Sequence, residues 1–313
     1  QEGEQSPRML KAQRALSSGV AHLRWLELSD EARARGRRAA AHFIAVSQPH
    51  AGAFLHAVPS APDMRISSSV FEVIVQRRLA LPLTALANVE FSANVGRVVD
   101  KCGDAIQNDG AHGARHNVVL RKWVNLLKAT FGAAAVRKEP KASAVFSPGV
   151  CPDAVVFKAA STFGGRANKD ILIETKLVSP TSSGEAGTAA MGGLAAQGNT
   201  EARLNDDILG TPARGKEPAK RGVYSGGIEL HQVVLPVVME VFGALGTDGC
   251  RLLDKCATKH GKRHGAESEV ATWATRSFRS MYAQRISVAL HIACATEILA
   301  TASADVAAAQ SAG

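Results

Sequence analysis

Residues 151–157 read Cys-Pro-Asp-Ala-Val-Val-Phe, and residues 170–178 read Asp-Ile-Leu-Ile-Glu-Thr-Lys-Leu-Val. Both runs are rich in β-branched and aliphatic residues, which are typical of strands. The segment between them contains Gly164 and Gly165, and glycine is common in the turns of β-hairpins. We therefore expect residues 151–178 to form an antiparallel hairpin at the centre of the fold.

Three ionisable residues converge if the hairpin pairs in this way. Glu174 and Lys176 are two positions apart, so in a strand they point to the same face, about 7 Å from each other. Asp153 opens the first strand and can lie beside Glu174 towards the end of the second. Two carboxylates can hold a hard divalent cation such as Mg²⁺ or Mn²⁺, usually with waters retained. A lysine beside them can orient or help deprotonate an attacking water and can offset phosphate charge.

The spacing Pro-Asp, twenty residues, Glu-x-Lys resembles the PD-(D/E)xK signature of nucleases. The preceding elements follow the order that such a core requires. Residues 115–131 have large apolar side chains at every fourth position, which predicts a helix. Residues 133–139 are expected to form a strand that Pro140 ends. An ordinary hairpin with solvated charged residues remains open as the alternative.

The remaining elements predict an α/β fold, a small mixed sheet flanked by helices with helical N- and C-terminal extensions. Residues 232–242 are strongly apolar and are expected to form a buried strand, in which Pro236 favours an edge or a bulge. We divide the chain into a helical linker region (1–110), a restriction-endonuclease-like core (111–260) and a C-terminal helical extension (261–313). In the extension, residues 267–302 are expected to form a long helix or helix pair.

Composition favours a polyanionic partner. The 313 residues carry a formal net charge of +9, the pI is about 9.5, and 46% are hydrophobic, which is enough for a core. The five cysteines show no Cys-x-x-Cys spacing, which favours a reducing compartment over a disulfide framework. No signal peptide is visible, and Glu297 and Asp305 interrupt the apolar tail, so no uninterrupted run reaches the roughly 18 residues that span a bilayer. We expect a nuclear or intracellular protein, not a secreted one, with no membrane partner.

Basic residues in several parts of the chain are candidates for contacts with DNA. Arg115 and His116 fall in the first turn of the helix at 115–131, where an anionic phosphate can bind, although a satisfied core or cap histidine is the alternative for His116. Residues 255–264 are expected to form a basic loop after a short helix near 251–257. The candidate DNA-binding residues are Arg115, His116, Lys138, Arg166, Lys259, Lys262 and Arg263.

Several stretches, in collinear order, look like the region downstream of the reverse transcriptase in non-LTR retrotransposon polyproteins that carry a restriction-like endonuclease. They are Gly52–Ser60, Arg77–Leu83, Arg115–Asn117, Arg137–Pro140, Pro152–Asp153, Val178–Pro180, Val241–Gly243 and Gln284–Leu290.

This resemblance implies a PD-(D/E)xK fold and metal-dependent nicking of target DNA, with Mg²⁺ or Mn²⁺ as cofactor. It implies that Asp153 and Glu174 are the metal carboxylates and Lys176 the motif lysine, with Glu139 as a further contributor. The partners it implies are DNA, element RNA and other parts of a longer polyprotein.

The chain departs from this family at the zinc knuckle, Cys-x-x-Cys…His…Cys, that usually precedes Arg-His-Asn. Cys102-Gly103 and Gly110-Ala111-His112 are present, but Val99 stands where the first cysteine would be and the last cysteine is missing. A structural zinc site needs four ligands. We therefore expect a degenerate remnant near residues 99–112 and no structural zinc.

The leading hypothesis is a Mg²⁺-dependent endodeoxyribonuclease, a phosphodiester hydrolase. One alternative is a catalytically inactive nucleic-acid-binding remnant of such a domain. Another is a helical interaction module in which the hairpin is only structural. The observation that separates the last from the first two is whether Asp153, Glu174 and Lys176 meet in one cleft.

Overall fold

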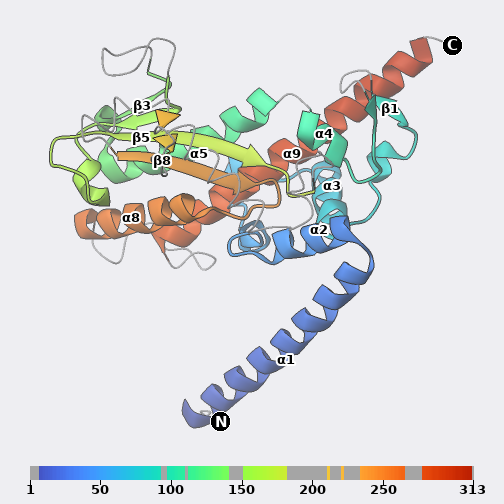
Figure 1. The fold of residues 1–313 in the computed structure, drawn as a ribbon, viewed down its shortest axis with the longest axis horizontal. Coiled ribbons are helices and arrows are strands. Elements are labelled where there is room, and N and C mark those ends of the chain that lie inside the picture. The colour runs from blue at the N-terminus through green and yellow to red at the C-terminus, as the bar shows by residue number, and fades with distance from the viewer. Residues whose placement is uncertain are drawn as a thin grey trace.

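The computed structural model describes residues 7–92, 97–109, 112–140, 151–181, 210–211, 220–221, 233–264 and 277–311. These residues form a mixed α/β fold in which helices flank a small sheet (Figure 1). In chain order the elements are α1 (Pro7–Ala34), α2 (Arg37–Ser47), the 3-10 helices η1 (Ala53–His56) and η2 (Pro62–Met64), α3 (Ser68–Arg78), η3 (Thr84–Leu86), β1 (Phe91–Ser92), β2 (Arg97–Val98), α4 (Asp104–Asp109), α5 (His112–Phe131), η4 (Ala133–Ala135), β3 (Val136–Lys138), β4 (Ala154–Val156), η5 (Ala160–Phe163), β5 (Ile171–Val178), β6 (Gly210–Thr211), β7 (Lys220–Arg221), β8 (Val233–Glu240), α8 (Thr247–His264) and α9 (Phe278–Ser311).

The main sheet has four strands in the order β3-β4-β5-β8. β3 and β5 both pair antiparallel with β4, whereas β8 runs parallel to β5. The expected hairpin, the apolar strand after it and a small mixed sheet flanked by helices are therefore confirmed. Of the strand expected at 133–139, only Val136–Lys138 is a strand, because Ala133–Ala135 form the 3-10 helix η4. β8 lies at an edge of this sheet, and its Pro236, which has no N–H to donate, is tolerated there opposite Glu174.

One face of the sheet is covered by α5, which confirms the helix expected at 115–131 and begins three residues earlier. Val119, Leu120, Trp123 and Leu127 of α5 are fully buried in one apolar cluster with residues of the sheet. Trp123 also donates its indole N–H to the sulfur of Met239, at 3.3 Å. The cluster fixes α5 against the sheet and so sets where the first turn of that helix lies.

The C-terminal helix α9 belongs to this core and does not extend away from it. Its first half joins the cluster under the sheet, and its second half forms another cluster with α3, η3 and α4. The sequence left open whether the flanking helices pack on the sheet domain, and α9 packs against both α5 and α8.

The apolar character of α9 follows from this packing. Contrary to the sequence expectation, Phe278–Ala307 is long and apolar enough to cross a membrane, because Glu297 and Asp305 are too few to lower its hydropathy. Of its most apolar window, however, 56% is buried inside the protein.

The basic stretch at 255–264 is helical, so the expected loop is wrong. Helix α8 continues through it because Leu252, Leu253, Cys256 and His260 form one buried stripe at helical spacing. Lys255 and Lys262 of this helix are exposed and Lys259 is half-buried, whereas His260 belongs to the buried stripe. The expected short helix near 251–257 is therefore only the middle of α8.

Helical periodicity in Ala12–Leu28 and in Asp30–Val46 predicts two N-terminal helices with a break near Asp30. Instead α1 runs on to Ala34, and Ser29 and Ala32 within it are buried. The break falls at Gly36, whose φ of 107° is a backbone conformation that favours glycine. On the N-terminal side of Gly36, α1 projects away from the rest of the molecule (Figure 1), with Leu16, Val20 and Leu23 exposed.

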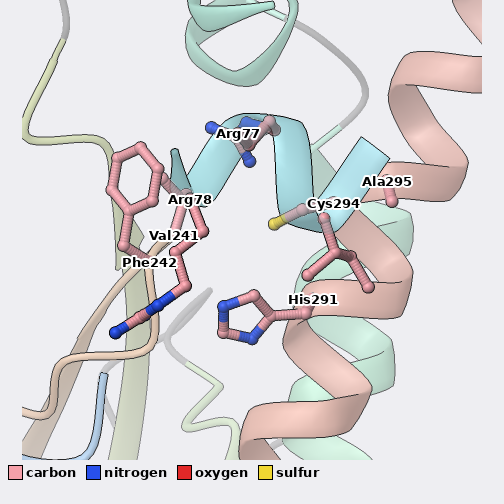
Figure 2. A pocket seen from close by; sticks show the side chains of 8 residues that line it. Arg77, Arg78, Val241, Phe242, His291, Cys294 and Ala295 are labelled. Atoms are coloured by element: carbon pink, nitrogen blue, oxygen red, sulfur yellow. The ribbon is translucent and has the colours of Figure 1, made fainter. Parts of the chain in front are cut away.

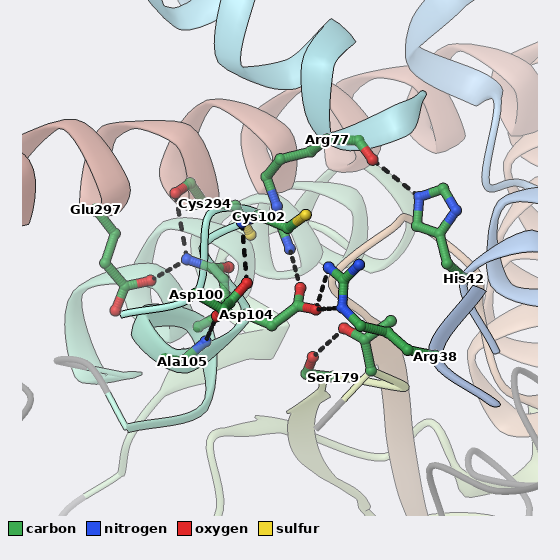
Figure 3. A network of polar contacts seen from close by, with 12 residues as sticks. Arg38, His42, Arg77, Asp100, Cys102, Asp104, Ala105, Ser179, Cys294 and Glu297 are labelled. Atoms are coloured by element: carbon green, nitrogen blue, oxygen red, sulfur yellow. Dashed lines mark hydrogen bonds and ion pairs between the residues drawn. The ribbon is translucent and has the colours of Figure 1, made fainter. Parts of the chain in front are cut away.

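A buried ionic network joins α2, α3 and α4 near the end of β5 (Figure 3). Asp104 accepts hydrogen bonds from Arg38 and lies 3.9 Å from the guanidinium of the buried Arg77. The side chain of Asp100 stabilises the start of α4. It accepts hydrogen bonds from the backbone N–H groups of Cys102 and Ala105, at 3.0 and 2.6 Å. This short helix was missed in the sequence because its signal is a side-chain cap and not periodicity.

A small cavity of about 10 Å³ lies between α3, the end of β8 and α9 (Figure 2). It is lined by Ile74, Arg77, Arg78, Val241, Phe242, His291, Cys294 and Ala295. The cavity has room for about one water molecule, so it is a packing gap and not a substrate site.

The last residue of β8 is an ionisable group in an apolar setting. Glu240 is completely buried, and neither of its carboxylate oxygens has a hydrogen-bond partner among the described residues. Burial raises its pKa from 4.5 to about 7. The folded protein therefore holds this proton more tightly than the unfolded chain does. The resulting stability is complete below pH 4.5 and is lost as the pH rises through about 7.

We predict that Glu240→Gln removes this pH dependence. The wild type should lose on the order of 3 kcal/mol of folding free energy between pH 4.5 and 8 through this group, and the variant should not. Urea unfolding at both pH values measures the difference. Glu90→Gln, at an exposed glutamate, is the control and should keep the wild-type slope. Equal slopes for wild type and Glu240→Gln would show that Glu240 ionises normally.

Candidate active site

The register of the hairpin brings the two predicted carboxylates together. Ala154 pairs with Ile173, so Asp153 lies directly beside Glu174. The backbone N–H of Thr175 donates to Oδ2 of Asp153 at 2.6 Å, and the N–H of Glu139 donates to the Asp153 carbonyl at 2.9 Å. Asp153 is thereby attached to both neighbouring strands.

Asp153, Glu174 and Lys176 open into one cleft of about 560 Å³. On β5, Ile171 and Ile173 face the apolar cluster, so alternation directs Glu174 and Lys176 to the other face. Lys176 is exposed, and no hydrogen bond or ion pair joins it to another described residue. The cleft is lined by Gln107, Gly113, Arg115, His116, Asp153, Glu174, Thr175, Lys176, Leu177 and Ser179.

His116 contacts Asp153 directly. Its Nε2 lies 3.0 Å from Oδ2 of Asp153, and the side chains of His116 and Asp153 are 26% and 14% exposed. This hydrogen bond is the main reason why the pKa of His116 is raised, with further contributions from the Asp153 charge, a backbone hydrogen bond with Thr175 and the Glu174 charge, against the effect of burial. In the structure His116 therefore contacts the carboxylate of Asp153. Its predicted contact with DNA stays a prediction.

Glu139 lies close to the same charges but outside the cleft lining. It follows β3 at a sharp turn, with a left-handed φ of 42°. The negative charge of Glu139 acts on the same neighbour as the charges of Asp153 and Glu174. Burial raises the pKa of Cys151 most, and these three carboxylates raise it further. A minor role in the site is therefore compatible with its position.

The donor set for a metal ion is small. Within the described ranges, no three His, Cys, Asp or Glu side chains are gathered closely enough to hold a metal ion. Oδ1 of Asp153 takes no hydrogen bond from any described residue, and Glu174 lines the same cleft. Mg²⁺ is commonly held by one or two carboxylates, with waters and substrate phosphate completing its shell. The two carboxylates fit that kind of site.

Arg115 is committed to the protein interior. Its side chain is 3% exposed and lies 2.9 Å from the Glu297 carboxylate of α9. It also donates to the side chain and the backbone carbonyl of Gln107, at 2.5 and 3.0 Å. These contacts tie the first turn of α5 to α4 and α9. Sequence reasoning missed both partners: Glu297 is 182 residues away in the chain, and Gln107, only eight residues away, lies in the short helix α4, which was itself not predicted.

The other basic candidates fall into two groups. Lys138 is near the cleft, since its Nζ lies 3.3 Å from Oδ1 of Asn117 in the first turns of α5. Lys259 instead lies over the ring of Phe131, at the opposite end of α5. The rise of a helix puts that end about 22 Å from His116. Lys262 follows Lys259 on the exposed face of α8.

Arg166 and Arg263 complete the candidate set. Arg166 is exposed in the turn of the hairpin, beyond the end of β4 that is remote from Asp153. The backbone of Arg263 is part of α8, but its side chain is not among those that the structure describes. The side chain of His112, from the degenerate knuckle, also lies outside them.

We predict that Arg115→Met lowers the stability of the protein by about 3–5 kcal/mol, because it leaves the Glu297 carboxylate buried without its positive partner and with only the hydrogen bond from the Gln107 amide. Chemical unfolding measures this loss. Arg115→Met combined with Glu297→Met should recover most of it, since an apolar pair of similar volume replaces the ion pair. Unchanged stability together with weaker DNA binding would instead assign Arg115 to DNA.

Comparison of the chain with protein-family models, curated proteins and solved structures finds no match. The geometry of the cleft is therefore the basis for a functional proposal, and the resemblance to the retrotransposon region stays an expectation.

Proposed function

We propose that the chain is a metal-dependent DNA endonuclease with a PD-(D/E)xK core, which nicks DNA by attack of water on a phosphodiester. The observation that carries the proposal is the convergence of Asp153, Glu174 and Lys176 on one cleft. The order of the elements supports it, since helix α5, strand β3 and the hairpin follow one another as such a core requires. The resemblance to retrotransposon polyproteins favours target DNA as substrate, a nuclear setting, and element RNA and other polyprotein parts as partners.

The residues of the cleft have separable roles in this proposal. Asp153 and Glu174 would hold Mg²⁺ or Mn²⁺, which when bound acts as a Lewis acid on the phosphate. Lys176 lies beside them with an exposed ammonium group that can hold the attacking water or offset phosphate charge. Water adds to phosphorus and gives up one proton to solvent, one P–O ester bond breaks, and the departing oxygen takes up a proton from solvent. The cleft is open, so a scissile phosphate and its waters can enter together.

Basic residues outside the cleft can hold the rest of a duplex. Lys255, Lys259 and Lys262 are spaced for one face of α8 and form no ion pair within the described part of the chain. Phe131, whose ring Lys259 contacts, lies about 22 Å from His116 by helix rise, which is less than one turn of B-DNA, about 34 Å. A duplex engaged by the cleft can therefore also reach α8.

We predict that purified protein nicks supercoiled plasmid in Mg²⁺ or Mn²⁺ and that Asp153→Asn and Lys176→Ala each reduce the rate at least about 100-fold. Losing a carboxylate or a group that stabilises the transition state commonly has an effect of this size. Conversion of plasmid to the open-circular form measures the rate. Lys101→Ala, at an exposed lysine, is the control and should nick as wild type does.

Two outcomes would contradict the proposal. One is equal nicking by wild type and Asp153→Asn, which would place the activity elsewhere or in a contaminant. The other is salt-sensitive DNA binding by wild type with no nicking under any metal condition, which would indicate the inactive nucleic-acid-binding remnant.

We also predict that Lys255→Gln combined with Lys262→Gln weakens the salt dependence of DNA binding. Each phosphate contact that is lost should reduce the slope of log K against log salt by about 0.9. Fluorescence anisotropy with a labelled duplex at several salt concentrations measures the slope. Lys11→Gln combined with Lys101→Gln removes the same charge elsewhere in the sequence and should leave the slope near that of wild type. Equal slopes for both double variants would exclude α8 from the interface.

A further inference from the structure

Asp153 is held through only one of its two carboxylate oxygens. The backbone N–H of Thr175 and Nε2 of His116 both bond Oδ2, at 2.6 and 3.0 Å. Oδ1 receives no hydrogen bond from the described residues. The two donors come from different elements, β5 and α5, and they converge on the same atom.

We propose that His116 is a positioning residue that orients Asp153, so that Oδ1 is the oxygen presented to the divalent cation. This inference rests on the proposed nuclease function and gives His116 a role other than the predicted contact with DNA. Two donors on one oxygen restrict rotation about the last torsion of the aspartate, and they leave the second oxygen as a single-atom ligand. Hydrogen bonds that orient a ligating carboxylate in this way contribute to metal affinity.

The place of His116 on α5 favours this role over one in DNA binding. Val119, Leu120 and Trp123 are buried and lie three, four and seven positions after it, so His116 continues the core-facing side of the helix. The ring thus reaches the cleft from the protein side and does not project from the exposed side of α5. Next to it, Arg115 secures the first turn of the helix through Gln107 and Glu297.

Of the two donors to Oδ2, only His116 can be removed by substitution, since the other is a backbone N–H. His116→Ala deletes the donor. His116→Gln keeps one, because the amide nitrogen of glutamine is the same number of bonds from Cα as Nε2 of histidine. His116→Asn carries the same amide one bond closer to the backbone and should not reach Asp153. The glutamine and asparagine variants form a matched pair that differs in reach alone.

The test is titration of the DNA-free protein with Mn²⁺ by calorimetry, together with the Mn²⁺ concentration that gives half-maximal nicking. We expect His116→Ala and His116→Asn to raise both values by about 10- to 100-fold. His116→Gln should stay within a few-fold of wild type. DNA affinity in metal-free buffer should be unchanged in all three variants, and melting temperatures establish that each one folds.

The outcomes separate this inference from the proposed function. If the wild type binds Mn²⁺ and nicks DNA while His116→Ala does both equally well, the positioning role is wrong and the nuclease stands. If the variants bind Mn²⁺ normally but lose affinity for DNA, His116 is a DNA contact. If the wild type neither binds Mn²⁺ nor nicks, the proposed function fails and the role of His116 fails with it. If His116→Ala does not fold, the comparison of glutamine with asparagine decides the question.

Discussion

The pairing of β4 with β5 is short, yet the positions of Asp153, Glu174 and Lys176 in the cleft follow from it. Only three residue pairs define its register, and burial fixes that register more firmly than the hydrogen bonds do. Ala154, Val156, Ile171 and Ile173 are all completely buried on the side of α5. A slip of β5 by one residue would turn Ile171 and Ile173 away from the apolar cluster and the charged residues of β5 into it. The polar positions of the hairpin are thus held in place by their apolar neighbours.

Helix α5 couples that sheet to the more distant parts of the chain. Its buried stripe lies on the strands, and its first turn is fastened to α4 and α9 through Arg115. A single helix therefore carries both the packing that orients it and the histidine that meets Asp153. Because the interior ion pair fixes the helix at one end and the apolar stripe fixes it along its length, His116 has little freedom to move relative to the sheet.

Much of the sheet could be predicted from the sequence, because the signals for it are local. Runs of β-branched and aliphatic residues on either side of a glycine-containing turn predicted the hairpin, a repeat every fourth residue predicted α5, and Pro236 correctly favoured an edge for β8. The convergence of Asp153, Glu174 and Lys176 also followed from local geometry, since a hairpin needs only its register. Local reasoning was wrong where charge was taken as a sign of irregular structure, because the basic run at 255–264 is one face of a helix whose other face is buried. The contacts of Arg115 with Glu297 and of His116 with Asp153 join residues far apart in the chain, and no single-sequence pattern specifies such contacts.

The way α9 is shared between two apolar clusters has a consequence for how the chain is made. Residues that complete both clusters lie between Phe278 and Ala302, whereas their partners in η1 and α3 lie before residue 80. During synthesis at about 5–20 residues per second, α3 and α5 leave the ribosome before the helix that packs against them exists. Closing such long loops is slow, and the apolar surfaces that await α9 stay exposed to solvent in the meantime. The two clusters are therefore completed only once α9 has been made, and a chain released before α9 would expose the apolar side chains that α9 buries.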